Sequence, residues 1–376
     1  MTYVYLKDGD PEIDSMLASV CETGGGTRQF TDLSLRLRGY PETRQRAEEA
    51  VATAKRPPRS PRHRNAKIWI YSVQYNRFRH HFETHEDSVA VAWNGITGTR
   101  RAFMAAARDA GRPTIYLERA PLPGRVTVDP VGINQLNGLP RDAGFYRDWA
   151  GADPDRTGPG WLALREKLQA RASARADVGQ GNGDTGLAGQ KFIFCPLQVP
   201  DDTQIRQFSG WVRDIEHFIE LLTEAAADLP EGWHLRFKEH PSSKIPLGAA
   251  LERAKAAQPD RVVIDNQTDT FFQVDRSQAV ITLNSSVGLQ AFYFEKPVIV
   301  LGEAFFRIPG LVTPVDDARA LHRVFAEADA ASYDKALRNA FMNYLGQVYY
   351  PELETGPDGH PKVKPDLVLP KLPATV

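Results

Sequence analysis

Short apolar runs alternate with amphipathic stretches along nearly all of the 376-residue chain, and this alternation restricts the possible folds most. In the first half, buried strands are predicted at 67–73, 88–93 and 114–118, with a helix at 98–110. The predicted strands of the second half are 191–195, 233–237, 261–264, 278–283 and 297–301. Its predicted helices are 210–227, 247–257, 286–294 and 316–328. Strands alternating with helices form parallel sheets from βαβ units, so the sequence predicts an α/β protein.

A change in composition predicts where the chain divides. Residues 171–189 are rich in Gly, Ala and small polar side chains, as a flexible linker would be. We therefore expect a first domain at 1–178, a linker at 179–189 and a second domain at 190–330. The remaining segment, 331–376, begins with a predicted helix that crosses back to the first domain.

Charge and cysteine content exclude several classes of protein. Formal net charge is −1, from 46 basic and 47 acidic residues, which disfavours nucleic-acid binding. Cys21 and Cys195 form no CxxC pattern, so no zinc knuckle or disulfide framework is expected. The N-terminus lacks a basic start followed by an apolar stretch, and no run reaches about 18 apolar residues. A soluble, cytoplasmic protein is the expectation.

One basic segment, 55–67, contains three prolines and most of the local positive charge. Because proline interrupts helices, an irregular segment is predicted here. Two interpretations remain open. The segment is a solvated loop, or it contacts anionic lipid head groups at the inner face of the membrane.

Two motifs that could bind a phosphate group follow predicted strands of the second domain. Lys238 and His240-Pro241 end the strand 233–237, and Asn284-Ser285-Ser286-Val287-Gly288 joins the strand 278–283 to a helix. Ligands of open α/β sheets bind at the carboxyl edge of the strands. Free N–H groups at a helix start bind phosphate, and glycine permits close approach. The alternative is a strand-end histidine and an ordinary helix cap.

Two carboxylates also follow predicted strands. Glu118 ends the strand at 114–118, and Asp202 lies in the loop after 191–195. A pair of carboxylates in different environments can act as nucleophile and acid/base in glycosyl chemistry. The alternatives are a surface Glu–Arg pair at Glu118 and a turn at Asp202. Two D-x-D sequences, Asp8-Gly9-Asp10 and Asp153-Pro154-Asp155, are interpreted as turns and not as metal sites.

An ordered series of short motifs resembles the capsule polysaccharide biosynthesis family, the bacterial retaining β-Kdo transferases. The resemblance runs from about Ile70 to Phe305. Its motifs, in chain order, are Trp93-Asn94-Gly95, Glu118 with Leu122-Pro123, Asp129-Pro130-Val131-Gly132-Ile133-Asn134, Pro196-Leu197-Gln198 with Asp202-Thr203-Gln204, Lys238-Glu239-His240-Pro241, Asn284-Ser285-Ser286-Val287-Gly288, and Lys296-Pro297-Val298 with Leu301-Gly302.

The resemblance implies a GT-B-like fold, in which two Rossmann-like domains with parallel sheets face a cleft. It also implies transfer of Kdo from CMP-β-Kdo to a lipid or glycan acceptor, with no catalytic metal and no cofactor. The N-terminal domain would bind the acceptor and the C-terminal domain the nucleotide sugar. The function would belong to capsule polysaccharide biosynthesis and export, at a cytoplasmic location with possible peripheral membrane contact through segment 55–67.

By the same resemblance, Asp202 would be the nucleophile and Glu118 the acid/base. Asp201 is adjacent, and Asp202 is chosen because Thr-Gln follows it. His240, Ser285 and Ser286 would hold the CMP phosphate. The other residues implied around the nucleotide sugar are Lys238, Asn284, Gly288, Gln198 and Glu303. Asn94 and Asn134 would lie on the acceptor side.

Two alternatives remain open at this stage. The donor could be another CMP- or UDP-activated sugar, because the phosphate motifs would serve either. The chain could instead be a non-catalytic GT-B-like scaffold in a capsule assembly or export complex.

Overall fold

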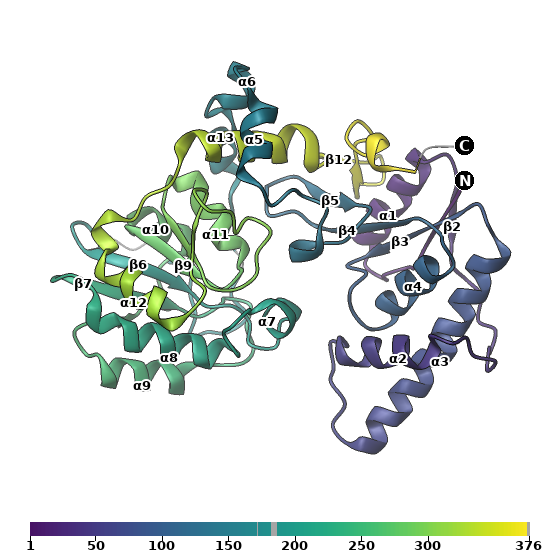
Figure 1. The fold of residues 1–376 in the computed structure, drawn as a ribbon, viewed down its shortest axis with the longest axis horizontal. Coiled ribbons are helices and arrows are strands. Elements are labelled where there is room, and N and C mark those ends of the chain that lie inside the picture. The colour runs from purple at the N-terminus through teal and green to yellow at the C-terminus, as the bar shows by residue number, and fades with distance from the viewer. Residues whose placement is uncertain (171, 182–185, 374–376) are drawn as a thin grey trace. The chain divides into compact units, whose positions relative to one another are not determined.

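The computed structural model of the protein describes residues 1–170, 172–181 and 186–373. The chain forms two compact units (Figure 1). Unit 1 comprises Met1–Leu139 and Leu345–Val376, and unit 2 comprises Pro140–Tyr344. Each unit has its own sheet and flanking helices, and all strand pairs of the two main sheets except one are parallel. The predicted α/β class with parallel sheets is confirmed.

The sheet of unit 1 has the strand order β2-β1-β3-β4-β5, in which only β5 is antiparallel to its neighbour. Its strands are β1 (Thr2–Tyr5), β2 (Thr27–Gln29), β3 (Ser88–Trp93), β4 (Thr114–Arg119) and β5 (Val126–Asp129). Its helices are α1 (Pro11–Thr23), α2 (Thr43–Ala52), α3 (Pro61–Thr84) and α4 (Gly98–Asp109). The strands predicted at 88–93 and 114–118 and the helix predicted at 98–110 are confirmed.

The strand predicted at 67–73 is wrong, because these residues lie inside helix α3. The helix begins with a strong local signal: the hydroxyl of Ser60 accepts a hydrogen bond from the backbone N–H of His63, and Pro61 occupies the first helical position. Only part of α3 is buried. Trp69 and Ile70, in the segment mistaken for a core strand, are 57% and 45% exposed.

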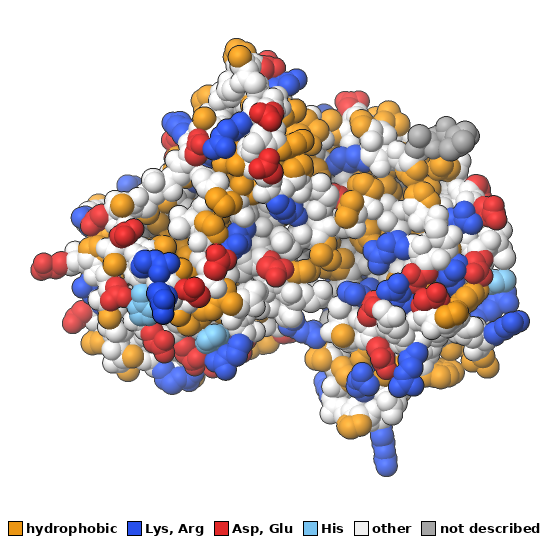
Figure 2. All heavy atoms as spheres, in the orientation of Figure 1, with side chains coloured by type: hydrophobic (Ala, Val, Ile, Leu, Met, Phe, Trp, Pro, Cys, Tyr) orange, Lys and Arg blue, Asp and Glu red, His pale blue; other side chains and the backbone are white. Residues whose placement is uncertain are grey.

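The irregular structure predicted for 55–67 is wrong in its second half for the same reason. Residues 61–67 form the first turns of α3, and 61–66 are exposed to solvent. Proline is compatible with a helix at its first position, where its missing N–H would have no partner in any case. Figure 2 shows Lys and Arg side chains on this end of α3.

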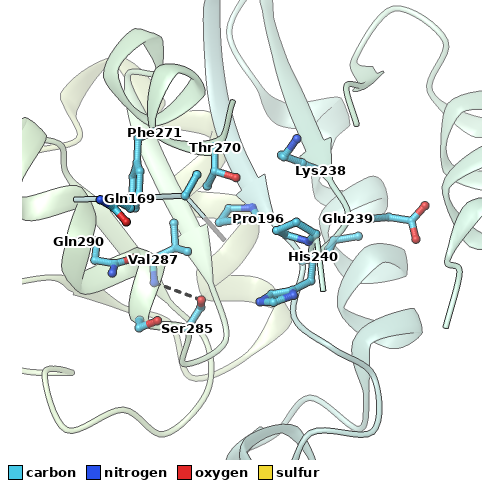
Figure 3. A pocket seen from close by; sticks show the side chains of 14 residues that line it. Gln169, Pro196, Lys238, Glu239, His240, Thr270, Phe271, Ser285, Val287 and Gln290 are labelled. Atoms are coloured by element: carbon cyan, nitrogen blue, oxygen red, sulfur yellow. Dashed lines mark hydrogen bonds between the residues drawn. The ribbon is translucent and has the colours of Figure 1, made fainter. Parts of the chain in front are cut away.

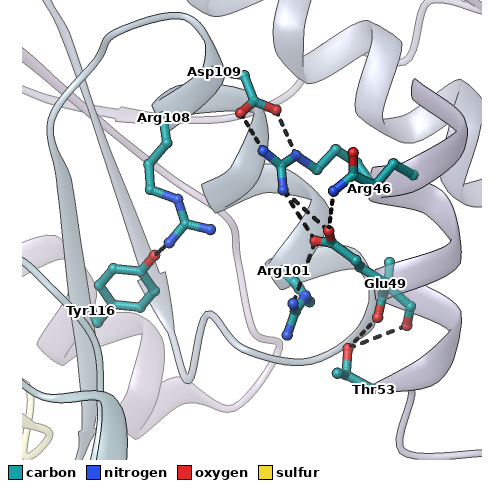
Figure 4. Close-up of polar contacts among 9 residues, drawn as sticks. Arg46, Glu49, Thr53, Arg101, Arg108, Asp109 and Tyr116 are labelled. Atoms are coloured by element: carbon teal, nitrogen blue, oxygen red, sulfur yellow. Dashed lines mark hydrogen bonds and ion pairs between the residues drawn. The ribbon is translucent and has the colours of Figure 1, made fainter. Parts of the chain in front are cut away.

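Helices α2, α3 and α4 are joined by partly buried polar contacts, several of which Figure 4 shows. The guanidinium of Arg46 donates two hydrogen bonds to Asp109, at 2.7 and 2.9 Å. The hydroxyl of Tyr75 donates to the same carboxylate at 2.7 Å. Arg46 and Arg101 both pair with Glu49. This network fixes α2 against α4.

The end of the chain completes unit 1. Strands β12 (Leu353–Thr355) and β13 (Pro361–Val363) form an antiparallel pair, and β13 packs on α1. The backbone N–H of Val363 donates to the hydroxyl of Ser19 at 3.0 Å, and Lys371 donates to the carbonyl of Val128 at 2.7 Å. The part of the predicted segment 331–376 that belongs to unit 1 begins at Leu345, and helix α13 before it belongs to unit 2.

Unit 2 has a parallel sheet in the order β11-β10-β9-β6-β7-β8. Its strands are β6 (Lys191–Pro196), β7 (Trp233–Lys238), β8 (Val262–Ile264), β9 (Ala279–Thr282), β10 (Val298–Val300) and β11 (Thr313–Pro314). Its helices are α5 (Ala143–Ala150), α6 (Pro154–Thr157), α7 (Thr203–Phe208), α8 (Ile215–Ala225), α9 (Gly248–Ala257), α10 (Thr270–Arg276), α11 (Ser286–Gln290), α12 (Ala318–Ala326) and α13 (Lys335–Tyr344). The core consists of buried side chains from β6, β7, β9 and the helices that cover them.

Short 3₁₀ and π segments accompany these helices. They are η1 (Asn134–Leu136), η2 (Gly160–Lys167), η3 (Ala226–Asp228), η4 (Ala291–Phe294), η5 (Ala328–Ala330), η6 (Leu345–Tyr349) and η7 (Leu369–Lys371). The helix predicted at 286–294 is thus divided into α11 and η4, and the helix predicted at the start of segment 331–376 corresponds to α13 and η6.

The units divide at Leu139–Pro140, and not at the predicted linker 179–189. Residues 140–178 belong to unit 2 because their aromatic side chains pack there: the indole N–H of Trp161 donates to Asn339 at 3.0 Å. Part of the predicted linker, 182–185, lies outside the described residues. The backbone N–H groups of Gly179 and Gly181 donate to carbonyls of Asn266 and Gln267, which attaches this segment to unit 2.

Candidate functional site

A pocket lies at the carboxyl ends of β6, β7 and β9 in unit 2. The space, including the part open to solvent, is about 570 Å³. From β6 the sheet grows first on one side, through β7 and β8, and then on the other side, through β9, β10 and β11. The strand order therefore reverses at β6, and ligands of open α/β sheets bind at such a switch point. The residues that line the pocket include Pro196, Leu197, Lys238, His240, Thr270, Phe271, Ser285, Ser286 and Gln290.

Within the Lys238–Pro241 motif, His240 is directed into the pocket, while Lys238 and Glu239 point away from Ser285 (Figure 3). Nδ1 of His240 lies 3.0 Å from the hydroxyl of Ser242. Glu239 is buried and pairs with Arg175 at 2.9 Å. An imidazole held at the end of a strand can contact a phosphate, whereas the neighbouring carboxylate is directed into the protein.

Lys238 is fully buried, and its ammonium donates to three backbone carbonyls. These belong to Gly179, Asn266 and Thr268, at 2.8, 3.0 and 2.7 Å. An ammonium has three donors, so all of them are used inside the protein. Burial lowers the pKa of Lys238 to about 8, although the nearby carboxylates of Asp265 and Asp269 oppose this change. The side chain supports the wall of the pocket and does not offer a donor to a ligand.

Asn284 and Gln198 form a hydrogen-bonded pair behind the pocket. The side-chain amide of Gln198 donates to Oδ1 of Asn284 at 2.8 Å, and Asn284 donates to the carbonyl of Phe208 at 2.8 Å. These bonds join the ends of β6 and β9 to α7. Neither residue belongs to the described lining of the pocket. Their hydrogen bonds instead hold the loops around the pocket in place.

Ser285 is the N-cap of α11, and its hydroxyl accepts a hydrogen bond from the backbone N–H of Val287 at 3.2 Å. Ser285 and Ser286 both line the pocket. Gly288 has a packing role: a Cβ added there would lie 2.9 Å from Cγ2 of Thr282 and 3.3 Å from the ring of Phe306. The glycine allows α11 to pack closely on β9.

Asp202 is the N-cap of α7, where Oδ1 accepts a hydrogen bond from the backbone N–H of Gln204 at 2.9 Å. Its side chain is exposed. Glu303 is also exposed, and its backbone N–H donates to the carbonyl of Phe208 at 2.8 Å. Neither belongs to the described residues that line the pocket.

Glu118 lies in unit 1, near the end of β4. Oε2 accepts a hydrogen bond from the side-chain amide of Asn94 at 3.0 Å, and Oε1 accepts one from the backbone N–H of Arg119 at 2.9 Å. Burial raises the pKa of the Glu118 carboxyl, and these two hydrogen bonds oppose the increase. A raised pKa suits a group that exchanges protons near neutral pH. Because Glu118 and Asp202 belong to different units, their action as a pair stays a prediction.

In the Asp129–Asn134 motif, the side chain of Asp129 stabilises the loop that follows it. This buried carboxylate accepts hydrogen bonds from the backbone N–H groups of Val131, Gly132 and Gly138 and from the hydroxyl of Tyr349, at 2.7 to 2.9 Å. The loop that carries Asn134, which has a φ of 52°, is thereby closed around one side chain.

Sequence reasoning missed the wall of the pocket formed by α10. Thr270 and Phe271 line it, and the Phe271 ring stacks on Phe294 with centroids 5.8 Å apart. Asp269, the N-cap of α10, is a local signal for this helix. Nothing in the local sequence shows that α10 lies beside the ends of β6 and β9.

Comparison with known proteins relates the part of the chain that carries this pocket to a described family. A family model described as "Capsule polysaccharide biosynthesis protein" matches residues 182–350, which include the ends of β7 and β9. The resemblance to the capsule polysaccharide biosynthesis family is confirmed. The matched residues, 182–350, cover most of unit 2 and the first residues of the C-terminal segment of unit 1.

Curated relatives include further capsule proteins. The chain is 29% identical over 290 residues to Protein FixF of Sinorhizobium fredii, covering 76% of this chain and 67% of FixF. It is 24% identical to the capsule polysaccharide modification protein LipB of Neisseria meningitidis serogroup B, covering 46% of this chain and 44% of LipB. It is 28% identical to the capsule polysaccharide export protein KpsS of Escherichia coli, covering 50% of this chain and 60% of KpsS. The matches thus span less than two thirds of LipB and KpsS.

A solved structure shares the fold along nearly the whole chain. Thermosulfurimonas dismutans KpsC, described as a beta Kdo 2,7 transferase, aligns with a TM-score of 0.50 at 14% identity and covers 98% of both chains. The predicted GT-B class, with two Rossmann-like units, is confirmed at the level of the fold. The chain therefore resembles capsule polysaccharide biosynthesis proteins in sequence and shares the fold of this KpsC structure.

Proposed function

We propose that the protein is a retaining glycosyltransferase that moves Kdo from CMP-β-Kdo to a lipid or glycan acceptor. The observation that carries this proposal is the pocket at the ends of β6, β7 and β9, which combines the imidazole of His240 with the hydroxyls of Ser285 and Ser286. These groups suit the phosphate of a sugar nucleotide. Phe271 supplies an apolar wall for the nucleoside.

The reaction would proceed by two displacements. A carboxylate oxygen of Asp202 attacks the anomeric carbon of Kdo, and the bond to the CMP phosphate breaks, with both electrons leaving on CMP. The acceptor oxygen then attacks the same carbon, its proton passes to Glu118, and the Asp202 carboxylate is released. Two inversions return the original configuration. Oδ1 of Asp202 is engaged at the helix cap, which leaves Oδ2 for the attack.

We further propose that no metal takes part, because His240 and the two serine hydroxyls can stabilise the leaving phosphate. The residues of the D-x-D sequences have other roles: Asp10 caps α1 and Asp153 caps α6. Full activity should therefore persist in excess chelator. A loss of activity that Mg²⁺ or Mn²⁺ restores would overturn this part of the proposal.

Incubation with CMP-β-Kdo and an acceptor should release CMP, measured by chromatography. Asp202→Ala should abolish the release, while Asp153→Ala, a matched helix-cap variant, should leave it intact. An unimpaired Asp202→Ala enzyme would sink the double-displacement mechanism. Thermal shifts with CMP-Kdo, another CMP sugar and a UDP sugar would identify the donor. A ligand at 100 times its dissociation constant adds about 2.7 kcal/mol of stability.

A non-catalytic role in export is the second candidate, and the similarity to the capsule polysaccharide export protein KpsS favours it. Calorimetry separates the two. Failure to bind any nucleotide would favour the scaffold, while CMP binding that His240→Ala removes would favour the enzyme.

A cytoplasmic location with peripheral membrane contact is also a proposal. No described helix has both the length and the apolar character that crossing a bilayer requires. The exposed start of α3 combines Arg62, Arg64, Trp69 and Ile70, a mixture that suits an anionic lipid surface. The protein should cosediment with anionic vesicles and not with neutral ones. Replacement of Arg62 and Arg64 should weaken this binding. Equal binding to both vesicle types would contradict the proposal.

A further inference from the structure

A second cavity, in unit 1, has a strongly cationic lining. It lies where the end of α2 meets the start of α4 and the side of α3, and its space, including the part open to solvent, is about 830 Å³. The residues that line it are Ala54, Lys55, Arg56, Lys67, Tyr71, Thr97, Gly98, Thr99 and Arg100. Four of them are cations, and no Asp or Glu belongs to the described lining.

The positive charge of this cavity is only partly neutralised. Arg100 forms an ion pair with Asp8, and Lys67 donates a hydrogen bond to the backbone carbonyl of Arg56. Lys55 and Arg56 are exposed, and within the described part of the chain neither forms an ion pair. A concave site with surplus positive charge favours an anion with several acceptor oxygens.

The cavity is connected to Glu118 by a short chain of hydrogen bonds. Thr97, in the cavity wall, donates from its hydroxyl to Oδ1 of Asn94 at 3.1 Å. Asn94 in turn donates to Oε2 of Glu118 at 3.0 Å. The charges of Lys55 and Arg100 lower the pKa of the Glu118 carboxyl, in opposition to burial, so both cations lie within electrostatic range of it.

The cavity is also held in shape by its surroundings. The network of Arg46, Glu49 and Asp109 fixes α2 against α4 (Figure 4). Thr53, two residues before Lys55, donates from its hydroxyl back to the carbonyl of Glu49 at 3.0 Å. Lys55 and Arg56 therefore extend from a fixed helix end, which reduces the entropy lost when a ligand binds.

We propose that this cationic cavity binds the negatively charged group of the acceptor, a phosphate or a carboxylate, and so brings the acceptor hydroxyl to Glu118. This inference rests on the proposed transferase function and narrows its acceptor to an anionic molecule. Lys55 and Arg56 are the residues that select the acceptor. Glu118 exchanges the proton, and Asn94 positions it.

Acetylation of lysines, followed by mass spectrometry, tests binding without any need for activity. Inorganic phosphate, acetate and a short-chain phosphatidylglycerol are compared with NaCl at the same ionic strength, because salt alone screens charge. The favoured anion should slow acetylation of Lys55 and Lys67 several-fold and leave Lys191, an exposed lysine of unit 2, unchanged. Preference for the lipid over inorganic phosphate would identify a head group as the source of the phosphate.

A double variant, Lys55→Gln/Arg56→Gln, should remove the protection of Lys67. Arg44→Gln, a charge change at an exposed position of α2, should retain it. Protection that is equal at Lys191, or that survives in the double variant, would overturn the inference.

The transfer assay then connects the cavity to the acceptor. The double variant should raise the acceptor KM about tenfold or more, the loss expected for one charge-assisted hydrogen bond, and leave hydrolysis of the donor by water unchanged. An unchanged acceptor KM would overturn the inference. If no variant or wild-type enzyme consumes any donor, the proposed function fails, and the acetylation result still decides whether the cavity binds anions.

Discussion

The side-chain amide of Asn94 donates a hydrogen bond to Oε2 of Glu118 at 3.0 Å, from a backbone in the left-handed region with a φ of 65°. Asparagine tolerates this conformation better than most residues. The hydroxyl of Thr97 binds the other end of the same amide at 3.1 Å, so the direction of the Asn94 side chain is fixed. The motif residue Asn94 thus acts on Glu118 from within unit 1.

Removal of the Asn94 amide should raise the pKa of Glu118 further, because this hydrogen bond stabilises the ionised carboxylate. The acidic limb of the pH profile of kcat/KM should therefore move to higher pH in Asn94→Gly. Glycine is chosen because it keeps the positive φ without strain. Asn134→Gly, also at a positive φ, should leave this limb in place. An unmoved limb in Asn94→Gly would mean that Glu118 does not set it.

Neighbouring residues of one motif should differ in their effects. His240→Ala should weaken CMP binding by roughly tenfold or more, because a hydrogen bond to phosphate is lost, and should leave the melting temperature near that of the wild type. Lys238→Met should lower the melting temperature, because three buried carbonyls lose their donor. Calorimetry and thermal unfolding measure the two effects. A Lys238→Met protein of normal stability that cannot bind CMP would contradict the structural role of Lys238.

Asp129→Ala should destabilise unit 1 by about 3 kcal/mol or more, because three backbone N–H groups and the Tyr349 hydroxyl lose a buried acceptor. Asp153→Ala removes a half-buried helix cap and should cost about 1 kcal/mol. Denaturant unfolding compares the two variants. Similar losses in both would contradict the central position of Asp129 in its loop.

Gly288→Ala should destabilise unit 2 by about 1–3 kcal/mol, because the new methyl group would overlap Thr282 and Phe306. Gly248→Ala is the control: it lies at the start of α9, where an added Cβ meets nothing within 4 Å. That variant should be neutral or slightly more stable. If Gly288→Ala is equally neutral, the glycine is not required for the packing of α11 on β9.

Sequence reasoning predicted the strands that are buried on both faces, such as β3, β6 and β9, because an uninterrupted apolar run between turn residues suffices to define them. It failed at 67–73, where an equally apolar run lies in a helix that begins at the Ser60-Pro61 cap. Periodicity does not distinguish the two cases when the run is short. The Leu139–Pro140 boundary was missed because it depends on packing around Trp161, which is a tertiary contact.

For the candidate site, too, the sequence predicted some features and not others. Motifs at strand ends pointed to His240, Ser285 and Ser286, which line the pocket at the carboxyl edge of the sheet, and their role in ligand binding stays a prediction. The roles of Lys238 and Asn284 could not be predicted, because their partners lie far away in the sequence and a side chain's direction depends on them. The cationic cavity was missed because Lys55 and Arg100 belong to different helical regions that meet only in the fold.

The C-terminal segment sets an order of events during synthesis. Unit 2 is contiguous in the chain, whereas unit 1 needs Leu345–Val376, which is synthesised after unit 2. Until then Ser19, Asp129 and Val128 lack the partners that Val363, Tyr349 and Lys371 supply. Unit 2 can therefore complete its core first, although it comes second in the sequence. Until the C-terminal segment is made, the first part of unit 1, which carries Glu118, is an incomplete sheet that chaperones can bind.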